Sequence, residues 1–317
     1  FEPQTVAVIG ASERADSIGA VLMRNILDAR FTGSLHAINP KHESVFGVPC
    51  VARVEDLRKR PDLAIICTPA ARVPGLIDEC GRAGIKAAVV ISPGFAEAGP
   101  AGAELERRTR TAAKRSGVRM VGPNCLGLMR PSIGLNGTFA RSYCKPGSIG
   151  LISQSGAICT ALLDWAQPNG VGFSTVVSLG ASIDLDFGEI LDYMIADPQT
   201  ESIFMYIEGI RDARRFMSAV RAAARVKPVF AIKVGRHRAG SKAVASHTGA
   251  MVGSDDVFDA ALRRAGVVRL ANLGQMFSAA NALFTGFKPS GKRLAVVTNG
   301  GGPGVMASDR AADLGIT

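Results

Sequence analysis

The sequence has few of the residues that build metal centres and disulfide frameworks. Its 317 residues include only four histidines, at positions 36, 42, 237 and 247, and these form no HxxH, HxH or HExxH pair. No cysteine lies within two residues of a histidine, so the ligand spacing of a zinc site is absent. The six cysteines form no CxxC pattern, and several lie in apolar runs, which is typical of reduced thiols in a cytoplasmic protein. We therefore expect neither a metal site nor disulfides.

Aromatic residues and long apolar runs are also scarce. One tryptophan and three tyrosines leave few stacking platforms for single-stranded nucleic acid. No run approaches the roughly 18 apolar residues of a membrane-spanning helix, and the first residues do not form a signal peptide. The net charge of +10 is spread along the chain, which favours a polyanionic small molecule over nucleic acid or a membrane as the ligand. The chain begins at Phe1 rather than Met, so we expect its natural start to lie upstream.

Short apolar runs alternate with amphipathic helical patterns along most of the chain. Over residues 1–128, runs such as "TVAVIGAS", "DLAIICTPA" and "IKAAVVISPGF" predict buried strands separated by helices. This alternation predicts a doubly wound parallel α/β sheet. We expect a linker over the Gly-, Ser- and Pro-rich residues 129–144 and a second α/β domain over 145–286. Residues 287–317 predict a strand, a glycine-rich loop and a helix, the incomplete start of a third α/β domain.

The loops after the first-domain strands carry the features of an anion site, because ligands of such sheets bind outside the carboxyl ends of the strands. The loop from Gly10 to Gly19 opens a helix, whose N–H groups and dipole favour a phosphate, although GxGxxG is absent. Lys41 and His42 replace the acidic residue of an NAD site, which suits a phosphorylated ribose. NADP and a plain turn with a solvated lysine remain alternatives. Three further strand-end turns predict a rim for an extended ligand: 67–70, 92–97 and 122–127.

Two more strand-to-helix loops follow. In "ISQSGA", at 152–157, Ser153 and Ser155 can cap a helix whose N-terminus would bind an anion. The stretch is similar to a nucleophile elbow but lacks GxSxG, and simple N-capping is the alternative. In "TNGGGPGVMA", at 298–307, the glycines leave N–H groups open to a phosphate, but no GK[ST] follows.

His247 lies in the glycine-bearing stretch "SHTGAMVG", where a solvated loop histidine is the plain alternative to a chemical role. Imidazole accepts a phosphoryl group when one nitrogen is free and the other is held by a carboxylate. Glu208 follows the apolar run "FMYIEG", and a carboxylate at the end of a buried strand needs a partner. We therefore interpret His247 and Glu208 as a candidate pair.

Five stretches together resemble the NDP-forming acyl-CoA synthetases: "VIGAS", "GPNCLG", "SQSGA", "DPQTESI" and "SHTGAMVGSDDVFDAALRRAGVVR". This family includes the ADP-forming acetate–CoA ligases and, more distantly, the α subunit of succinyl-CoA synthetase. The similarity covers nearly the whole chain in the order of the family's motifs. It implies a Rossmann-like CoA-binding domain, a flavodoxin-like phosphohistidine domain and the activity of an acid–thiol ligase.

The resemblance also implies roles for individual residues. His247 would be the phosphorylated nucleophile, and Glu208 would orient it. The phosphoryl group would be bound at two helix N-termini, by Ser153, Ser155, Gly156 and Ala157 at the first and Asn299, Gly300, Gly301, Gly302 and Gly304 at the second. Coenzyme A would be bound by Gly10, Ala11, Ser12, Lys41, Thr68, Pro69, Asn124 and Cys125, with Lys41 facing the 3′-phosphate of its ribose.

The chain departs from the family in lacking the ATP-grasp part. ATP or ADP with magnesium would therefore bind to a missing domain or subunit, and the substrate would be a small carboxylic acid. We expect an oligomer in the cytoplasm. Two alternatives stay open, an NADP-dependent oxidoreductase and an acyl-CoA-sensing regulatory module of a GNAT-type protein lysine acetyltransferase. The second rests on "DWAQ" and "DARRFMSAVRAAARVKPVFAIKVGRH", which resemble those proteins.

Overall fold

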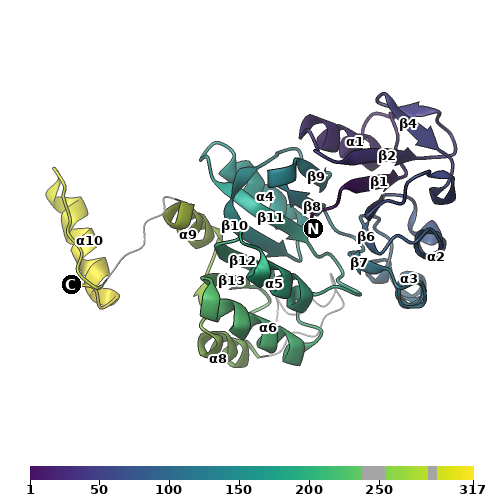
Figure 1. The fold of residues 1–317 in the computed structure, drawn as a ribbon. Coiled ribbons are helices and arrows are strands. Elements are labelled where there is room, and N and C mark those ends of the chain that lie inside the picture. Colours follow the sequence, from purple (N-terminus) through teal and green to yellow (C-terminus); the bar gives the residue numbers. More distant parts are fainter. Residues whose placement is uncertain (238–253, 285–290) are drawn as a thin grey trace.

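The computed structural model describes residues 1–237, 254–284 and 291–317, and its N-terminal part is a doubly wound sheet (Figure 1). The seven strands lie in the order β3-β4-β2-β1-β5-β6-β7, and all neighbours are parallel except β3 and β4. Their bounds are β1 (Thr5–Ile9), β2 (Ser34–Ile38), β3 (Ser44–Val45), β4 (Val48–Val51), β5 (Leu63–Ile66), β6 (Ala87–Val90) and β7 (Arg119–Val121). The predicted α/β class is confirmed.

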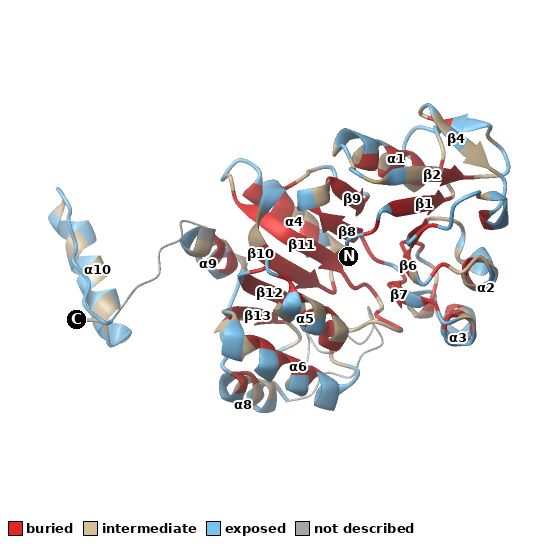
Figure 2. Ribbon diagram, in the orientation of Figure 1, coloured by how far each residue is buried: buried red, intermediate tan, exposed pale blue. Residues whose placement is uncertain are grey.

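Alternate residues of the central strand pack on different helices. Val6 and Val8 of β1 belong to a buried cluster with Leu22 of α1 (Ile18–Asp28). Ala7 and Ile9 belong to another cluster with α2 (Val73–Arg82) and α3 (Pro100–Ser116). Because side chains alternate across a strand, α1 covers one face of the sheet and α2 and α3 cover the other. Residues 6–9 of β1 are therefore apolar on both faces of the sheet. Figure 2 shows β1 as buried.

The second sheet has the order β14-β13-β12-β10-β11-β8-β9. Its strands are β8 (Gly127–Arg130), β9 (Leu135–Thr138), β10 (Lys145–Ser153), β11 (Gly172–Ser178), β12 (Ser202–Ile207), β13 (Val229–Lys233) and β14 (Val268–Leu270). One buried cluster packs α4 (Gly156–Ala166) and α9 (Leu273–Phe284) on this sheet. The other packs α5 (Phe187–Ala196), α6 (Ala213–Val226) and α8 (Asp255–Ala265). This sheet is also covered by helices on both faces.

The expected linker over 129–144 is irregular only in part, because residues 139–144 form no helix or strand whereas the residues before them belong mostly to β8 and β9. Strands β8 and β9 pair with each other in antiparallel fashion, and β8 pairs with β11, so they form an edge of the second sheet. Leu135 and Thr138 are fully buried there. The linker was predicted from the abundance of Gly, Ser and Pro. The strands β8 and β9 are too short to show a clear alternation in the sequence, and burial against α1 and β11 stabilises them.

The expected strand near 292–298 is not formed as such. Leu294 N donates to Thr317 O, and Thr317 N donates to Lys292 O, both over 2.7 Å. These bonds have the spacing of parallel strands, but a strand requires a longer paired partner. Val297 remains 96% exposed. Helix α10 (Gly301–Asp313) follows and lies apart from the two sheets (Figure 1).

The two α/β units are joined by main-chain and charged contacts. Between Leu179 and Phe187 the chain runs beside the end of β7, where Ala181 N donates to Pro123 O over 2.9 Å and Ile183 N to Gly122 O over 3.2 Å. Arg119 of β7 is paired with Asp184. The carboxyl end of the first sheet is thereby held against the loop that follows β11.

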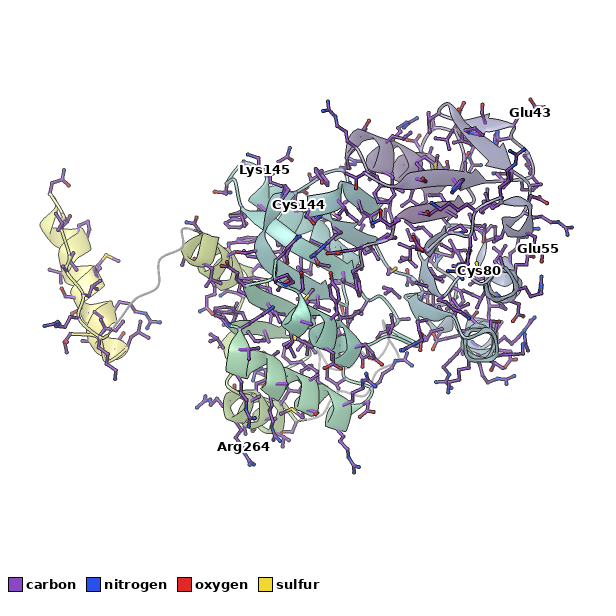
Figure 3. All side chains as sticks on the ribbon, viewed as in Figure 1. Glu43, Glu55, Cys80, Cys144, Lys145 and Arg264 are labelled. Carbon is purple, nitrogen blue, oxygen red and sulfur yellow. The ribbon has the colours of Figure 1, made fainter. Side chains whose placement is uncertain are left out.

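The six cysteines are free, as expected. Cys80 lies within the first unit and Cys144 within the second, and both thiols are buried (Figure 3). Burial raises the pKa of each thiol to about 12, which makes both unreactive near neutral pH. In the described part of the chain, no helix has the length and apolar character that crossing a membrane requires.

Candidate functional site

The first half of the site is the loop between β1 and α1. Gly10 has a φ of +100°, and a Cβ on Gly19 would lie 2.1 Å from the carbonyl oxygen of Gly10. Glycine at position 19 therefore allows α1 to begin directly against the end of β1. Ser17 caps α1, because its side chain accepts a hydrogen bond from Ala20 N over 3.2 Å. Ala11 and Ser12 lie in this loop, where the predicted anion site begins.

Asn39 connects this loop to Lys41, and the sequence analysis missed it. Its Nδ2 donates to Ala11 O over 2.7 Å, and its Oδ1 accepts from Lys41 N over 3.0 Å. Strand β2 pairs directly with β1, and the exposed Lys41 comes shortly after β2. Lys41 and the loop after β1 therefore follow neighbouring strands. An Asn directly after a strand and before Pro was the signal that could have identified it.

The ends of β5 and β7 complete the rim. Thr68 O accepts a hydrogen bond from Ser92 Oγ over 2.5 Å, and the buried Thr68 Oγ1 has no protein partner among the described residues. Pro69 and Asn124 are exposed. Cys125 differs from the expectation, because its thiol is buried and lies 3.3 Å from Val90 O. Its side chain points away from the rim, and burial raises its pKa to about 12.

The second predicted anion site lies at the N-terminus of helix α4, directly after β10. The buried Ser153 donates from Oγ to Ser155 O over 2.9 Å and accepts from Ser155 N over 3.1 Å. Ser155 is the N-cap of α4 and accepts from Ile158 N over 3.4 Å. The serine hydroxyls thus shape the turn, as the capping alternative predicted. Gly156 and Ala157 form the start of the helix, where N–H groups can face an anion.

Glu208 lies at the same edge, directly after β12, and is only 5% exposed. Gln154 Oε1 accepts from Glu208 N over 2.6 Å, and Lys233 Nζ donates to Glu208 O over 3.0 Å. Neither partner was predicted from the sequence. Lys233 is the last residue of the buried strand β13 and its only charged residue. A charged residue at the end of a buried strand is the same pattern that identified Glu208.

The structure does not bring all the predicted residues together. His247 falls within 238–253, outside the described residues. Asn299 precedes Gly300, the N-cap of α10, and Gly301, Gly302 and Gly304 begin that helix, which lies away from α4 (Figure 1). The described part of the site therefore consists of the α4 N-terminus, Glu208 and the rim of the first sheet.

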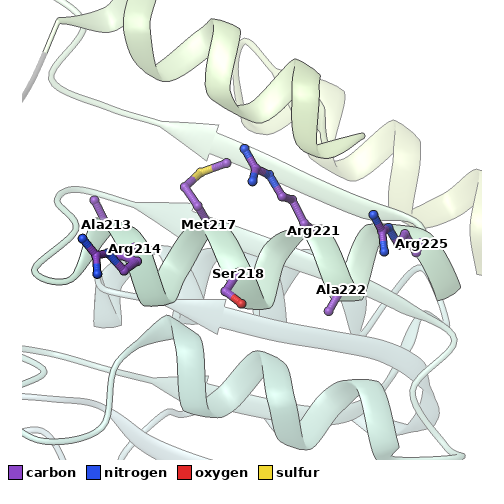
Figure 4. Close-up of a pocket in the computed structure, with 7 residues that line it drawn as sticks. All are labelled: Ala213, Arg214, Met217, Ser218, Arg221, Ala222 and Arg225. Carbon is purple, nitrogen blue, oxygen red and sulfur yellow. The ribbon is translucent and has the colours of Figure 1, made fainter.

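A groove on the outer face of α6 is separate from these strand ends (Figure 4). Its lining comes from one helix: Ala213, Arg214, Met217, Ser218, Arg221, Ala222 and Arg225. It contains none of the residues of the rim or of the α4 turn, so it is not part of the candidate site.

Comparison with known proteins matches both units to family models. Residues 4–131 match a CoA binding domain, and residues 146–283 match a succinyl-CoA ligase like flavodoxin domain. The chain is 44% identical over 316 residues to the acetate–CoA ligase [ADP-forming] I of Archaeoglobus fulgidus, covering 100% of this chain and 46% of that protein. It is 38% identical to the acetate–CoA ligase [ADP-forming] I subunit alpha of Pyrococcus furiosus, covering 100% of this chain and 69% of the subunit.

A solved structure has the same arrangement. The dinucleotide forming acetyl-coenzyme A synthetase 1 of Ca. Korarchaeum cryptofilum, in complex with phosphate and ADP, superposes with a TM-score of 0.95 and 38% identity. The superposition covers 100% of this chain and 68% of that one. The chain spans about half the length of some curated relatives, such as the Archaeoglobus ligase. These relatives are ligases, so they support neither the acetyltransferase nor the oxidoreductase alternative, and the chain belongs to the family of ADP-forming acyl-CoA synthetases.

Proposed function

We propose that this chain is the CoA-binding and phosphohistidine-carrying portion of an ADP-forming acyl-CoA synthetase. The reversible reaction is acyl-CoA, phosphate and ADP to carboxylate, CoA and ATP. The observation that carries the proposal is the α4 turn and the buried Glu208 at one sheet edge, beside a first sheet whose open strand ends suit a phosphorylated ligand. The similar synthetase of Ca. Korarchaeum cryptofilum was solved with phosphate and ADP.

Coenzyme A would bind along the rim of the first sheet. The N–H groups at the start of α1 would face its diphosphate, and Lys41 its 3′-phosphate. Thr68 Oγ1, which is buried and has no hydrogen-bond partner within the part of the chain that the structure describes, fits a polar atom of the ligand. Gly10, Ala11, Ser12, Pro69 and Asn124 would approach it, whereas Cys125 contributes only main chain.

The chemistry would take place beside α4. A phosphate oxygen attacks the thioester carbonyl and expels the thiolate of CoA, which gives an acyl phosphate. A nitrogen of His247 then attacks phosphorus, and the carboxylate leaves with the electron pair of the broken P–O bond. The first turn of α4 would stabilise the charge on the transferred group, and Glu208 would hold the second imidazole nitrogen.

The last transfer, from the histidine to ADP, needs the ATP-grasp part, which would bind the nucleotide with magnesium. We infer that a further domain or a separate subunit supplies it, since one similar protein is named as subunit alpha. The relatives named for acetate and 4-hydroxybutyrate support a small carboxylic acid as the substrate. The second phosphate site at Asn299 to Gly304 would form only after α10 approaches α4.

The test is transfer of labelled phosphate to the protein. The complete protein is incubated with acetyl-CoA and [³²P]phosphate, and acid-labile, base-stable label is measured. Label is expected in the wild type and absent in His247→Ala. Equal label in both proteins would contradict the assignment of the histidine, and absence of label in both would contradict the proposed chemistry.

A further inference from the structure

Gln154 binds three main-chain groups next to the Glu208 side chain. Its Oε1 accepts from Glu208 N over 2.6 Å and from Gly209 N over 3.0 Å, and its Nε2 donates to Gly209 O over 2.9 Å. Gln154 is 7% exposed and comes from the end of β10, the neighbour of β12 in the sheet. One side of the Glu208 backbone is therefore fixed by a buried side chain.

Lys233 binds the other side from β13, which is the other neighbour of β12. It is 6% exposed, and its Nζ donates to Glu208 O over 3.0 Å and to Val234 O. The ammonium lies 5.5 Å from the centroid of the Phe258 ring. Burial lowers the pKa of Lys233, while Asp255 and Glu208 raise it and Arg269 lowers it further.

All four main-chain hydrogen-bonding groups of Glu208 and Gly209 are thus bound by two buried side chains, Gln154 and Lys233, which come from the flanking strands. A strand end with no further role could leave these main-chain N–H and C=O groups hydrogen-bonded to water. Burying an amide and an ammonium instead is expensive, and it fixes the backbone from which the carboxylate projects.

We propose that Gln154 and Lys233 are positioning residues that hold the Glu208 carboxylate in the orientation needed for phosphoryl transfer. This inference rests on the proposed function, in which Glu208 orients the phosphorylated histidine. Neither side chain needs to touch the substrate, because both act through the Glu208 main chain. A misplacement of about 1 Å in such a group can cost on the order of 100-fold in rate.

The chain offers a matched control at the opposite end of the same strand. Lys227 precedes β13, and its Nζ donates to Met194 O over 2.6 Å and to Asp197 O over 2.7 Å. It therefore makes the same kind of contact as Lys233, a lysine bound to two carbonyl oxygens. It lies at the edge of the sheet away from Glu208. If the role of Lys233 is purely structural, Lys233→Met and Lys227→Met should change the labelling rate and the melting temperature equally.

The experiment compares Lys233→Met, Lys227→Met, Gln154→Glu and Glu208→Gln in the complete protein. The readouts are the initial rate of labelling by acetyl-CoA and [³²P]phosphate, the KM for acetyl-CoA and the melting temperature. We expect Lys233→Met to slow labelling about 10- to 100-fold with KM nearly unchanged. Lys227→Met should melt at a similarly lowered temperature but label at the wild-type rate. Gln154→Glu keeps the acceptor and loses the donor, so it should label at an intermediate rate.

A double variant separates positioning from independent effects. Lys233→Met combined with Glu208→Gln should be no slower than Glu208→Gln alone, because Lys233 acts through Glu208. Additive losses, or equal labelling by Lys233→Met and Lys227→Met, would overturn the inference. If Lys233→Met does not fold, the same cycle with Gln154→Glu decides the question. Failure of the proposed function would give a different result. In that case Glu208→Gln would be labelled at the same rate as the wild type, or the wild type itself would take up no label.

Discussion

Replacing Arg130 by methionine should destabilise the second unit strongly, because it leaves a buried carboxylate without its cation. The side chains of Arg130 and Asp197 are 1% and 2% exposed, and they form two bonds, Nη1 to Oδ2 at 2.7 Å and Nη2 to Oδ1 at 2.9 Å. Arg130 also donates to Thr175 Oγ1 over 2.8 Å and to Glu2 Oε1 over 2.6 Å. It therefore ties β8 to β11, to the end of α5 and to the N-terminal segment.

The expected loss follows from this burial. Breaking a buried ion pair by removing one partner costs about 3–5 kcal/mol, whereas an exposed pair contributes about 0–1 kcal/mol. Arg82 and Glu55 form such an exposed pair, with side chains 61% and 45% exposed, so Arg82→Met is the control. In urea unfolding followed by circular dichroism, the Arg130→Met midpoint should fall by roughly 1 M or more. Equal midpoints for the two variants would refute the reasoning.

The same pair predicts how stability depends on pH. Burial alone would raise the pKa of Asp197, but hydrogen bonds from Arg130 and Thr200 lower it below its ordinary value. Because the folded pKa lies below the unfolded one, the stabilisation is complete above about pH 4 and is lost as pH falls through the folded pKa. Asp197→Asn should lose this part of the acid dependence. An unchanged acid profile, measured by urea midpoints from pH 2 to 6, would contradict the assignment.

Three further predictions concern the first unit. Lys41→Glu should weaken the binding of CoA by about 10-fold or more, with little effect on dephospho-CoA, since only CoA carries the 3′-phosphate. Calorimetry would measure both, Lys114→Glu on the outer face of α3 is the control, and equal losses for the two ligands would contradict the assignment. Gly19→Ala should cost about 1–3 kcal/mol in thermal unfolding, because its Cβ would lie 2.1 Å from a carbonyl oxygen; an unchanged melting temperature would show that α1 can shift freely. Cys125 should resist iodoacetamide at pH 8 in the folded protein, because its pKa of about 12 leaves almost no thiolate, and rapid labelling detected by mass spectrometry would refute its placement.

The local pattern of the chain was enough to predict the α/β class. Short continuous apolar runs, such as those ending at Ile9 and Ile66, predict strands covered on both faces, and the helical patterns between them supply the covering helices. The positions of the strand-end loops were predictable for the same reason. Gly10 and Lys41 follow strands of the first sheet and Ser155 follows a strand of the second, and the carboxyl ends of the parallel strands within each sheet meet at one edge.

The sequence predicted the structure less well where the local composition is typical of a linker but burial stabilises a strand. Residues 129–144 have the composition of a linker, yet Leu135 and Thr138 are fully buried in β9. That burial depends on contact with α1, more than a hundred residues earlier, where Asn25 Nδ2 donates to Thr138 O over 2.8 Å. No local window contains both residues.

The sequence by itself determined the alternation of strands and helices, the positions of the strand-end loops and the identity of the charged residues in them. Only the tertiary structure decided which of these residues support one another. Gln154 reaches Gly209 across 55 positions, and Lys233 reaches Glu208 across 25. The Cys125 thiol was directed inward by its contact with Val90. Backbone periodicity is a local property of the chain, whereas a hydrogen-bond partner in a parallel sheet is chosen by strand order, which is set only when the whole core packs.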